Sequence, residues 1–529
     1  MRVLTTERLT FNVRPSRRGS LVVAGHTAPA APKAPSPLVR VRRHLARARE
    51  RYDWDYLWML TFTALLFLRP QDHVAALESL HLAELSAIAG LAAMAVRRLH
   101  AGQALVKINA EVVAVVVLGA IIVVTIPFSI WPTGSLTVFT EIYVKVILIF
   151  AFMMSTITTP RRLQQMTWVM IIASGYIACR GVIDYGSGVN LVEGDRLAGA
   201  VGGIFKNPND LALNLVTFLA PTLFVIIQEE RTPRRLLAAL IAVVMVVATT
   251  FTKSRSGFLG LVAMTTVIAY YTARIKPGFI MAVVVAGMLA LPALPASFWM
   301  RMDSIVNAEE DTTGSRAARI RLLNQGLEVF AANPLTGVGA GQFQNYNAPD
   351  VVEKWRVTHN VWLQVAAELG VFGLLTFAFL VARAYTSCFA ALRMLQRPRR
   401  RRAFSHPAVA GAPLAGDEQS ALNRAGLPAN DEQLSEEDRR ILEINAKSMI
   451  AGLVGWSVCA FFASVAFNWT FYYVLALAVA GREIVASRRD VQRREKNTMR
   501  ATKKTRSAIR PAGCGVLLPS TIAEQTGAR

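Results

Sequence analysis

Three cations lie in short polar stretches that border apolar runs. Lys253 and Arg255 belong to TTFTKSRSGFLG, a stretch too short to form a domain of its own. Arg196 belongs to a second stretch, EGDRLAGAVGGIFKNPNDLALNL, which is rich in glycine and amide residues. Arginine holds phosphate and diphosphate groups through paired, charge-assisted hydrogen bonds. These residues therefore predict an anion-binding site, although long cationic side chains at the ends of membrane spans also extend to lipid headgroups.

A third polar stretch contains an amphipathic helix and two more arginines. The sequence DTTGSRAARIRLLNQGLEVFAANPLTG predicts a helix that Ser315 caps and that ends at Asn333 and Pro334. Arg316 and Arg319 are one turn apart, so their guanidinium groups can bind the same anion, or else lie on a solvated or lipid-facing surface. Apolar residues form a stripe at helical spacing along the same segment, at Ile320, Leu323, Leu327 and Phe330.

A histidine adds a possible proton acceptor to these cations. His359 precedes a long apolar run in THNVWLQVAAELGVFGLL. An imidazole accepts a proton near neutral pH, although a lone histidine at a membrane interface more often has a structural role. Here the histidine is predicted to face the same compartment as the arginines. The combination suits transfer chemistry on a lipid diphosphate.

The sequence predicts neither a metal site nor a nucleotide site. The run GVGAGQF has three glycines but no Lys-Ser or Lys-Thr pair, and no strand is evident before it, so it predicts a flexible or tightly turning connection. Acidic residues on the same side are few and lack metal-ligand spacing. The four cysteines are scattered and include no CxxC pair, which indicates neither a disulfide framework nor a zinc site. We therefore expect chemistry without a metal or another cofactor.

The elements that must position these residues are membrane-spanning helices. Hydrophobic residues make up 53% of the 529 residues. Repeated apolar runs of about 17 to 25 residues are each long enough to cross a membrane, so the sequence predicts an all-α polytopic membrane protein with about twelve transmembrane helices. The predicted spans are 55–69, 80–97, 109–128, 137–157, 164–183, 208–228, 235–251, 256–273, 278–295, 360–386, 446–467 and 470–486.

The distribution of charge predicts the orientation of these spans. The formal net charge is +23, and most of the lysine and arginine lies in both tails and in alternate loops. Basic loops and tails are typical of the cytoplasmic side and of attraction to anionic lipids, which fits better than binding to nucleic acid. Both termini are therefore predicted to be cytoplasmic. The predicted organisation is a disordered basic arm 1–52, a transmembrane core 53–386 with an outer loop 296–358, a charged insert 387–445, two last spans within 446–486 and a basic tail 487–529.

Four segments resemble, in this order, the O-antigen ligase/polymerase superfamily of bacterial membrane proteins. They are RLAGAVGGIFKNPNDLA, TKSRSGFLGL, TGSRAARIRLLNQGLEVFAANPLTGVGAGQF and THNVWLQVAAELGVFGLL. The likeness covers roughly residues 127–383, and the combination of GSR, a helix, NPLTGVGxGxF and HNxxLQ is fairly specific. The insert and both tails lie outside the shared pattern.

The resemblance implies a GT-C-like integral membrane glycosyltransferase of the bacterial inner membrane. Such enzymes take a glycan from undecaprenyl diphosphate on the periplasmic face and use neither a metal nor a nucleotide sugar. Ligases attach the glycan to lipid A-core, polymerases attach it to another lipid-linked repeat unit, and relatives attach it to protein, in lipopolysaccharide or exopolysaccharide biosynthesis. Its partners would be the donor, the acceptor, the bilayer and other polysaccharide assembly proteins. The matched segments do not identify the acceptor.

The resemblance also implies roles for individual residues. Arg196 and Arg255 match arginines thought to hold the diphosphate. His359 matches the histidine proposed to activate the acceptor hydroxyl, and Arg316 matches the arginine of the GSR motif. The candidate catalytic residues are thus His359, Arg255 and Arg196, and the candidate substrate-binding residues are Arg316, Arg319 and Lys253.

Two other classes of protein remain open. A transporter or flippase for an anionic solute or a lipid-linked sugar would also need many spans, but its ionisable groups would lie near the middle of the membrane. Here the charges are expected at one face, and Glu141 and Lys145 are the main exception, unless they form a structural pair. The third interpretation is a membrane scaffold that recruits partners through its basic tails.

Overall fold

The structure is a computed structural model. It describes residues 53–70, 77, 80–192, 195–199, 205–273, 276–278, 281, 285, 292, 296–303, 315–346, 357–396 and 434–508. Side chains are described for these residues except 297, 301, 315, 316 and 491–508. All of the described residues except Asp53 belong to one unit, Trp54–Arg529.

This unit is helical nearly throughout its described part. The strands found there are β1 (Leu191–Val192) and β2 (Arg196–Leu197), an antiparallel pair in which Leu191 lies opposite Leu197. The helices are α2 Trp54–Leu68, α3 Leu82–His100, α4 Ala110–Thr125, η3 Ile126–Phe128, α5 Pro132–Thr137, the π-helical η4 Val138–Tyr143, α6 Val144–Thr156, α7 Pro160–Gly186, α8 Pro208–Gln228, α9 Thr232–Phe251, α10 Arg255–Thr272, α12 Ala296–Asp303, α13 Ser315–Ala332, η7 Phe343–Asn345, α14 Val361–Gln396, α16 Glu436–Ala460 and α17 Trp469–Ala508.

Seven helices in the described residues are long and apolar enough to cross a membrane. They are Ala110–Phe128, Pro132–Thr156, Pro160–Gly186, Pro208–Gln228, Thr232–Phe251, Val361–Gln396 and Trp469–Asp490. Helices α2, α3, α10 and α16 occupy four more of the predicted spans without belonging to this set. The predicted span 278–295 lies mostly outside the described residues. An all-α polytopic membrane protein is thus confirmed, and a total of about twelve spans stays a prediction.

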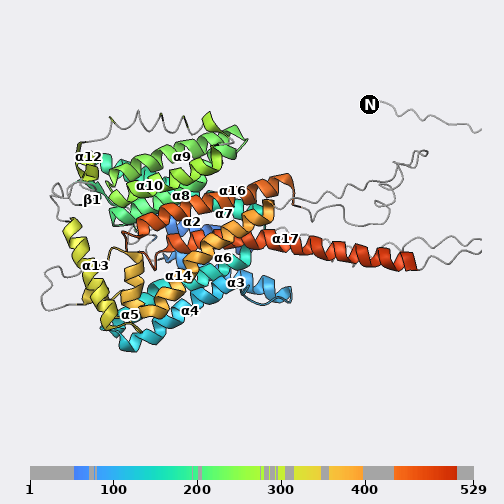
Figure 1. Ribbon diagram of the computed structural model, residues 1–529, viewed down its shortest axis with the longest axis horizontal. Helices are drawn as coiled ribbons and strands as arrows, with labels where there is room; N and C mark the ends of the chain where they lie inside the picture. The colour runs from blue at the N-terminus through green and yellow to red at the C-terminus, as the bar shows by residue number, and fades with distance from the viewer. Residues whose placement is uncertain are drawn as a thin grey trace, which may run out of the picture. The chain divides into compact units, whose positions relative to one another are not determined.

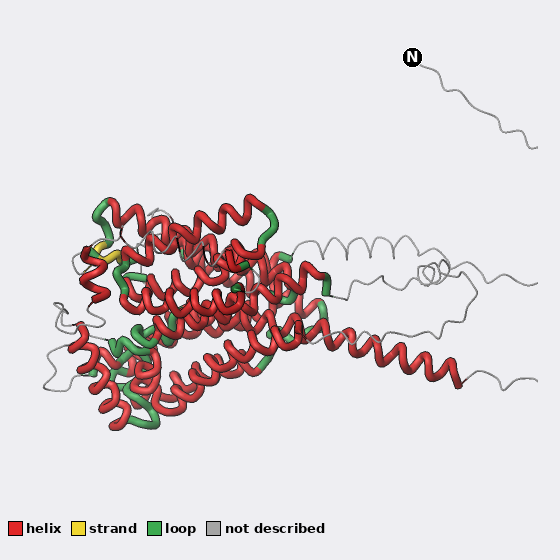
Figure 2. Tube along the Cα trace, turned by 45° about the horizontal axis from the view of Figure 1, so that its top comes forward, coloured by secondary structure: helices red, strands yellow, loops and turns green. Residues whose placement is uncertain are grey.

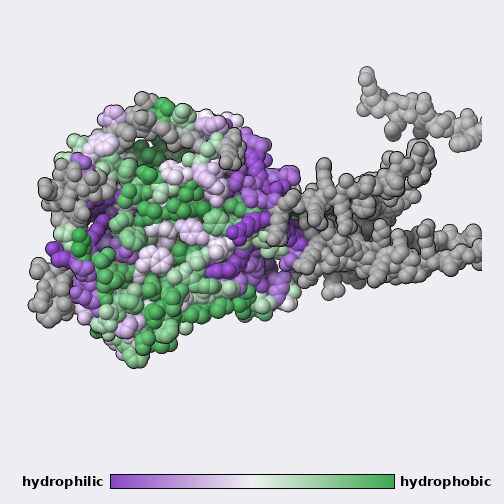
Figure 3. Space-filling view, viewed as in Figure 1, coloured by the Kyte–Doolittle hydropathy of each residue, from purple (hydrophilic) through white to green (hydrophobic). Residues whose placement is uncertain are grey.

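The helices of this unit lie side by side, and the loops between them gather at the two ends of the bundle (Figures 1 and 2). The visible face has a broad hydrophobic band between two hydrophilic ends (Figure 3). One such band is what a bilayer requires of helices that cross it. The end that carries α13 is called the α13 end below; it includes the α9–α10 turn and the start of α14.

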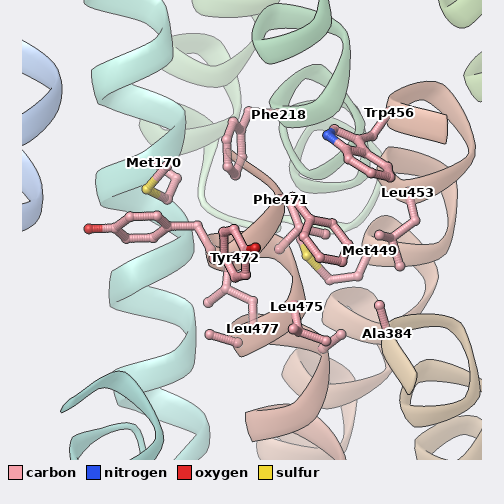
Figure 4. Packing of buried hydrophobic residues seen from close by; sticks show 14 of the residues in the cluster. Met170, Phe218, Ala384, Met449, Leu453, Trp456, Phe471, Tyr472, Leu475 and Leu477 are labelled. Carbon is pink, nitrogen blue, oxygen red and sulfur yellow. The ribbon is translucent and has the colours of Figure 1, made fainter. Parts of the chain in front are cut away.

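The centre of the bundle is held by close packing around α8. This helix packs against α7, α9, α10 and α16, and more of it is buried than of the other six candidate spans. Next to it, Phe471 of α17 stacks on Trp456 of α16 with ring centroids 4.7 Å apart, and Phe218, Met449 and Leu453 surround the same space (Figure 4). Because lipid tails are as apolar as these side chains, van der Waals packing holds the spans together.

Several helices are longer than the apolar runs that predicted them. Helix α14 continues to Gln396, and α16 begins at Glu436, so helices extend into both ends of the predicted insert 387–445. The side chain of Ser435 caps α16 by accepting a hydrogen bond from the backbone N–H of Asp438 at 2.9 Å. Helix α17 reaches Ala508 because Arg, Lys and Glu favour helix and no glycine or proline occurs between Gly481 and Ala508.

A buried ion cluster ties three spans together at the end opposite α13. The carboxylate of Glu111, which is 0% exposed, accepts hydrogen bonds from Arg383 at 2.6 Å and from Arg482 at 2.8 Å. These residues come from α4, α14 and α17. Removal of one partner from a buried ion pair leaves an uncompensated charge, which costs far more than an exposed pair is worth.

Replacement of Glu111 with alanine is therefore expected to lower the free energy of unfolding by about 3–5 kcal/mol, because two guanidinium groups lose their buried carboxylate. Thermal unfolding of the detergent-purified protein measures this effect. Glu328→Gln is the control, since Glu328 is exposed on α13. Equal melting temperatures for the two variants would show that the cluster contributes little.

Candidate functional site

A cavity of about 350 Å³ lies at the α13 end of the bundle. Three of the six predicted site residues line it: Arg255 at the start of α10, Arg319 on α13 and His359 directly before α14. All three side chains are half-buried. The remaining lining consists of Ser256, Leu259, Ile320, Leu323, Thr358, Asn360, Phe461 and Phe462. Side chains from separate parts of the chain thus face one space.

Arg255 owes its position to the turn between α9 and α10. Lys253 adopts a left-handed conformation with φ of 48°, and Ser254 caps α10 by accepting a hydrogen bond from the backbone N–H of Gly257 at 3.2 Å. Arg255 is then the first residue of the helix. The partial positive charge of the helix start adds to that of its guanidinium group.

Arg196 lies behind this turn and is not among the residues that line the cavity. Its Nε donates to the carbonyl oxygen of Thr252 at 3.1 Å, and its Nη2 donates to Oδ1 of Asn209 at 3.1 Å. The hydroxyl of Ser254 donates to the same Asn209 oxygen at 2.7 Å. With a side chain only 5% exposed, Arg196 therefore fastens β2, the start of α8 and the α9–α10 turn to one another.

Lys253 is also held inside the protein. Its side chain is 2% exposed, and its ammonium group pairs with the carboxylate of Asp195, next to β2. The alternative that Lys253 extends to lipid headgroups is therefore wrong. Like Arg196, Lys253 does not line the cavity. Its ion pair with Asp195 holds the α9–α10 turn, which positions Arg255.

His359 is positioned by a clamp between the start of α14 and the turn after α16. Its backbone is left-handed, with φ of 49°, a conformation that costs free energy for a residue with a side chain. The N–H of His359 donates to the hydroxyl oxygen of Ser464 at 2.9 Å, and the hydroxyls of Thr358 and Ser464 are also 2.9 Å apart. Asn360 caps α14 by accepting from the N–H of Trp362 at 2.9 Å. The flanking residues of the HNxxLQ motif thus anchor the backbone, and the histidine side chain faces the cavity.

Ser464 is a positioning residue that the sequence did not indicate. Ser464→Ala is expected to lower the activity of this site about tenfold, which corresponds to the loss of about one hydrogen bond from a buried N–H group. Ser464→Thr keeps the hydroxyl and is expected to restore activity. Activity and melting temperature measured together separate this role from a structural one. A normal rate for Ser464→Ala, or failure of Ser464→Thr to rescue it, would count against the clamp.

Helix α13 packs on the protein through a face other than its apolar stripe. Its buried residues are Ala318, Leu322, Gly326 and Val329. The predicted apolar stripe is instead mostly exposed, at Ile320, Leu323 and Leu327. A small residue explains the choice, because a Cβ atom on Gly326 would lie only 2.5 Å from the side chain of Leu363 on α14. This orientation directs Arg319 into the cavity, whereas the side chain of Arg316 lies outside the described residues.

The glycine run after α13 is a tight connection, as predicted, that docks on a bend in α14. The N–H of Gly341 donates to the carboxylate of Glu368 at 2.8 Å, and the N–H of Gly339 donates to the carbonyl oxygen of Glu368 at 3.0 Å. Gly337 has φ of 64°, and a Cβ atom there would lie 2.3 Å from the backbone of Glu368. The close approach of two backbone segments therefore requires a glycine at position 337. A carboxylate within an apolar run was the signal that could have identified Glu368.

The cavity combines positive charge with an apolar wall. Its described lining holds two arginines, a histidine and the start of α10, and it holds no carboxylate. The apolar part of the lining is Leu259, Ile320, Leu323, Phe461 and Phe462. Two guanidinium groups and a helix start are suited to a diphosphate, and the apolar wall is suited to the chain of a lipid.

Across the described residues, no group of three or more histidine, cysteine or acidic side chains is arranged to hold a metal ion. The cysteines Cys179, Cys388 and Cys459 are free thiols in the structure. Activity without a metal nevertheless stays a prediction, because it concerns the reaction and not the geometry of the protein alone.

Fold and site together define a polytopic α-helical membrane protein with a cavity lined by two arginines and a histidine at one end of its bundle. Residues 214–378 match the family model described as O-antigen ligase. This match confirms the resemblance of this part of the chain to the O-antigen ligase/polymerase superfamily. It includes Arg255, Arg319 and His359 and ends before α16. No curated protein matches the chain. A ligase- or polymerase-type function in polysaccharide assembly follows from the family.

Proposed function

We propose that this protein is a GT-C-like glycosyltransferase that moves a glycan from undecaprenyl diphosphate to a sugar acceptor on the periplasmic face of the inner membrane. The product would belong to a surface polysaccharide, an exopolysaccharide or lipopolysaccharide. The observation that carries the proposal is the convergence of Arg255, Arg319 and His359 in one cavity with an apolar wall. The family match supports the same class of reaction.

The donor would bind through its diphosphate. Arg255 and Arg319 bracket the anion, the N-terminus of α10 adds backbone N–H groups, and Arg316 precedes Arg319 by one turn on α13. The lipid chain would leave the cavity along Leu259 and Phe461 toward the membrane. Preorganised cations stabilise the negative charge that develops on a departing diphosphate, which is the task a metal performs in many other transferases.

His359 would act on the acceptor. Its imidazole takes the proton of the acceptor hydroxyl while that oxygen forms a bond to C1 of the donor sugar. The bond between C1 and the diphosphate oxygen breaks on the opposite side, and its electron pair stays with the diphosphate held by Arg255 and Arg319. Displacement in line inverts the configuration at C1. A backbone clamp matters for this step because a base must lie within hydrogen-bond reach of the proton that it removes.

Arg196 and Lys253 would serve the reaction indirectly. Both are buried in contacts that hold the α9–α10 turn, through Asn209 and Asp195 respectively. Replacement of either residue would displace Arg255 and so weaken donor binding, although neither residue itself would contact the donor. The proposed orientation, with both termini in the cytoplasm, places the cavity in the periplasm and is supported by the basic tails and loops at the other side.

The glycans that remain on the lipid carrier in a strain without this gene test the proposal and identify the acceptor class. Long polymers on the carrier are expected if the protein is a ligase, because chain growth proceeds and attachment fails. Single repeat units are expected if it is a polymerase, because chain growth itself fails. Lipid-linked glycans that stay in the cytoplasmic leaflet would indicate a flippase. A pool equal to that of the parent strain would contradict transfer.

A further inference from the structure

The cavity of the proposed reaction has an uncharged polar part that the mechanism does not use. Beside the cations, its lining contains Ser256, Thr358 and Asn360, which are 3%, 3% and 9% exposed. The hydroxyl of Thr358 is occupied, because it donates to the carbonyl oxygen of Asn360 at 3.1 Å and pairs with the hydroxyl of Ser464 at 2.9 Å. Ser256 and Asn360 are the two that keep hydrogen-bonding capacity for a ligand.

The amide of Asn360 is fixed in one orientation. Its Oδ1 accepts hydrogen bonds from the backbone N–H groups of Trp362 at 2.9 Å and Leu363 at 3.1 Å. Only the oxygen of an amide can accept, so these two bonds also fix the place of the NH2 group. Neither N–H of that group has an acceptor in the described part of the chain, and Nδ2 is not among its fully enclosed polar atoms. Asn360 therefore offers unpaired donors to the cavity that it lines.

The hydroxyl of Ser256 offers the opposite polarity. Its Oγ lies 3.0 Å from Oγ of Ser254. Ser254 uses its own hydrogen to donate to Oδ1 of Asn209 at 2.7 Å, the oxygen that also accepts from Arg196 at 3.1 Å. Ser256 must therefore donate its hydrogen to Ser254, since a hydroxyl has only one. The oxygen of Ser256 can then only accept a further hydrogen bond.

The positions of the two residues in the chain indicate which part of a donor they would meet. Ser256 follows Arg255, which the proposed reaction assigns to the diphosphate, and Asn360 follows His359, which it assigns to proton transfer beside C1. Within the sugar ring, C1 is bonded to the ring oxygen and to C2. The substituent on C2 is therefore the sugar group nearest to both the diphosphate and the reacting carbon.

We propose that Asn360 and Ser256 bind the substituent on C2 of the donor sugar, and that this substituent both accepts and donates a hydrogen bond. The inference rests on the proposed function. A hydroxyl or an acylamino group meets the requirement, because its oxygen accepts from Asn360 and its O–H or N–H donates to Ser256. A 2-deoxy sugar would leave a buried donor and a buried acceptor without partners, which costs free energy.

Four undecaprenyl diphosphate probes, titrated onto the detergent-purified protein and followed by native mass spectrometry, test the proposal. One carries no sugar, and the others carry glucose, N-acetylglucosamine or 2-deoxyglucose. We expect wild-type protein to bind the glucose probe or the N-acetylglucosamine probe about tenfold more tightly than the 2-deoxyglucose probe, the effect of about one hydrogen bond. The tighter of the two identifies the substituent as a hydroxyl or an acylamino group.

Two variants locate the effect. Asn360→Ser keeps an oxygen that can cap α14 and leaves the charge unchanged, but it removes the NH2 group. Ser256→Ala removes the accepting oxygen. Both variants are expected to lose the preference and to keep the affinity of wild-type protein for the sugar-free probe. Asn109→Ser is the matched control and should keep the preference, since Asn109 caps α4 by accepting from the N–H of Val112 at 2.8 Å and does not line the cavity.

Equal binding of the three sugar probes by wild-type protein would overturn the proposal, and so would a preference that persists in either variant. Loss of the sugar-free probe from these variants would overturn it too, because their residues would then have a structural role. The proposed function fails by a different result, since it requires Arg255→Ala to lose the sugar-free probe. Wild-type protein that binds none of the four probes would contradict the proposed function and this proposal together.

Discussion

Replacement of Arg255 with alanine is expected to lower the rate of glycan transfer about 100-fold or more. Arg255 lines the cavity at the start of α10, where a fork of N–H donors can bridge two diphosphate oxygens. Loss of one preorganised donor to a developing anion costs about 100- to 1,000-fold in other enzymes. Transfer by the purified variant in liposomes, with donor and acceptor supplied, measures the loss directly.

Two further variants separate the role of Arg255 from that of charge alone. Arg255→Lys keeps the charge but not the fork, so its rate should fall between those of wild type and alanine. Arg321→Ala removes the same charge from an exposed position on α13 that does not line the cavity, and its rate should stay normal. A normal rate for Arg255→Ala would remove this residue from the mechanism. An equal loss in Arg321→Ala would point to net charge as the cause.

Replacement of His359 with asparagine is expected to lower transfer by about 100- to 10,000-fold, the usual contribution of a general base. Asparagine is the informative choice because it tolerates the left-handed backbone that His359 adopts, whereas alanine adds strain. Donor binding should change little, since the diphosphate is held by arginines.

The kinetics of His359→Asn distinguish a base from a structural residue. We expect kcat to fall while the KM for the donor stays close to that of wild type, at an unchanged melting temperature. Loss of donor binding together with lowered stability would instead assign His359 a structural role. A rate equal to that of wild type would exclude it as the base.

Much of the fold and part of the site follow from the sequence. Apolar runs predicted the helices because a bilayer accepts few other structures, and eleven of the predicted spans coincide with helices. Arg255, Arg319 and His359 meet in one cavity, as their shared side of the membrane suggested. The charge of an arginine and the proton-accepting imidazole of a histidine are known from the residue type alone, so these three residues could be identified from the sequence.

Residues that act through distant partners could not be identified in this way. Ser464 and Asn209 are small polar residues whose importance arises from contacts with His359 and Arg196, formed only after folding. The packed face of α13 could not be identified for another reason. In water an apolar stripe marks the buried face, but beside a membrane lipid accepts it equally well, so the small residue Gly326 decided which face packs on α14.

Reconstitution of the purified protein in liposomes tests the central claim most directly. The assay supplies an undecaprenyl diphosphate-linked glycan, an acceptor glycan and a metal chelator, and it follows the glycan on the acceptor together with free undecaprenyl diphosphate. The account predicts that both products appear in equal amounts with wild-type protein and that neither appears above background with Arg255→Ala or His359→Asn. Movement of the glycan or of a solute across the bilayer with no new glycosidic bond would contradict it.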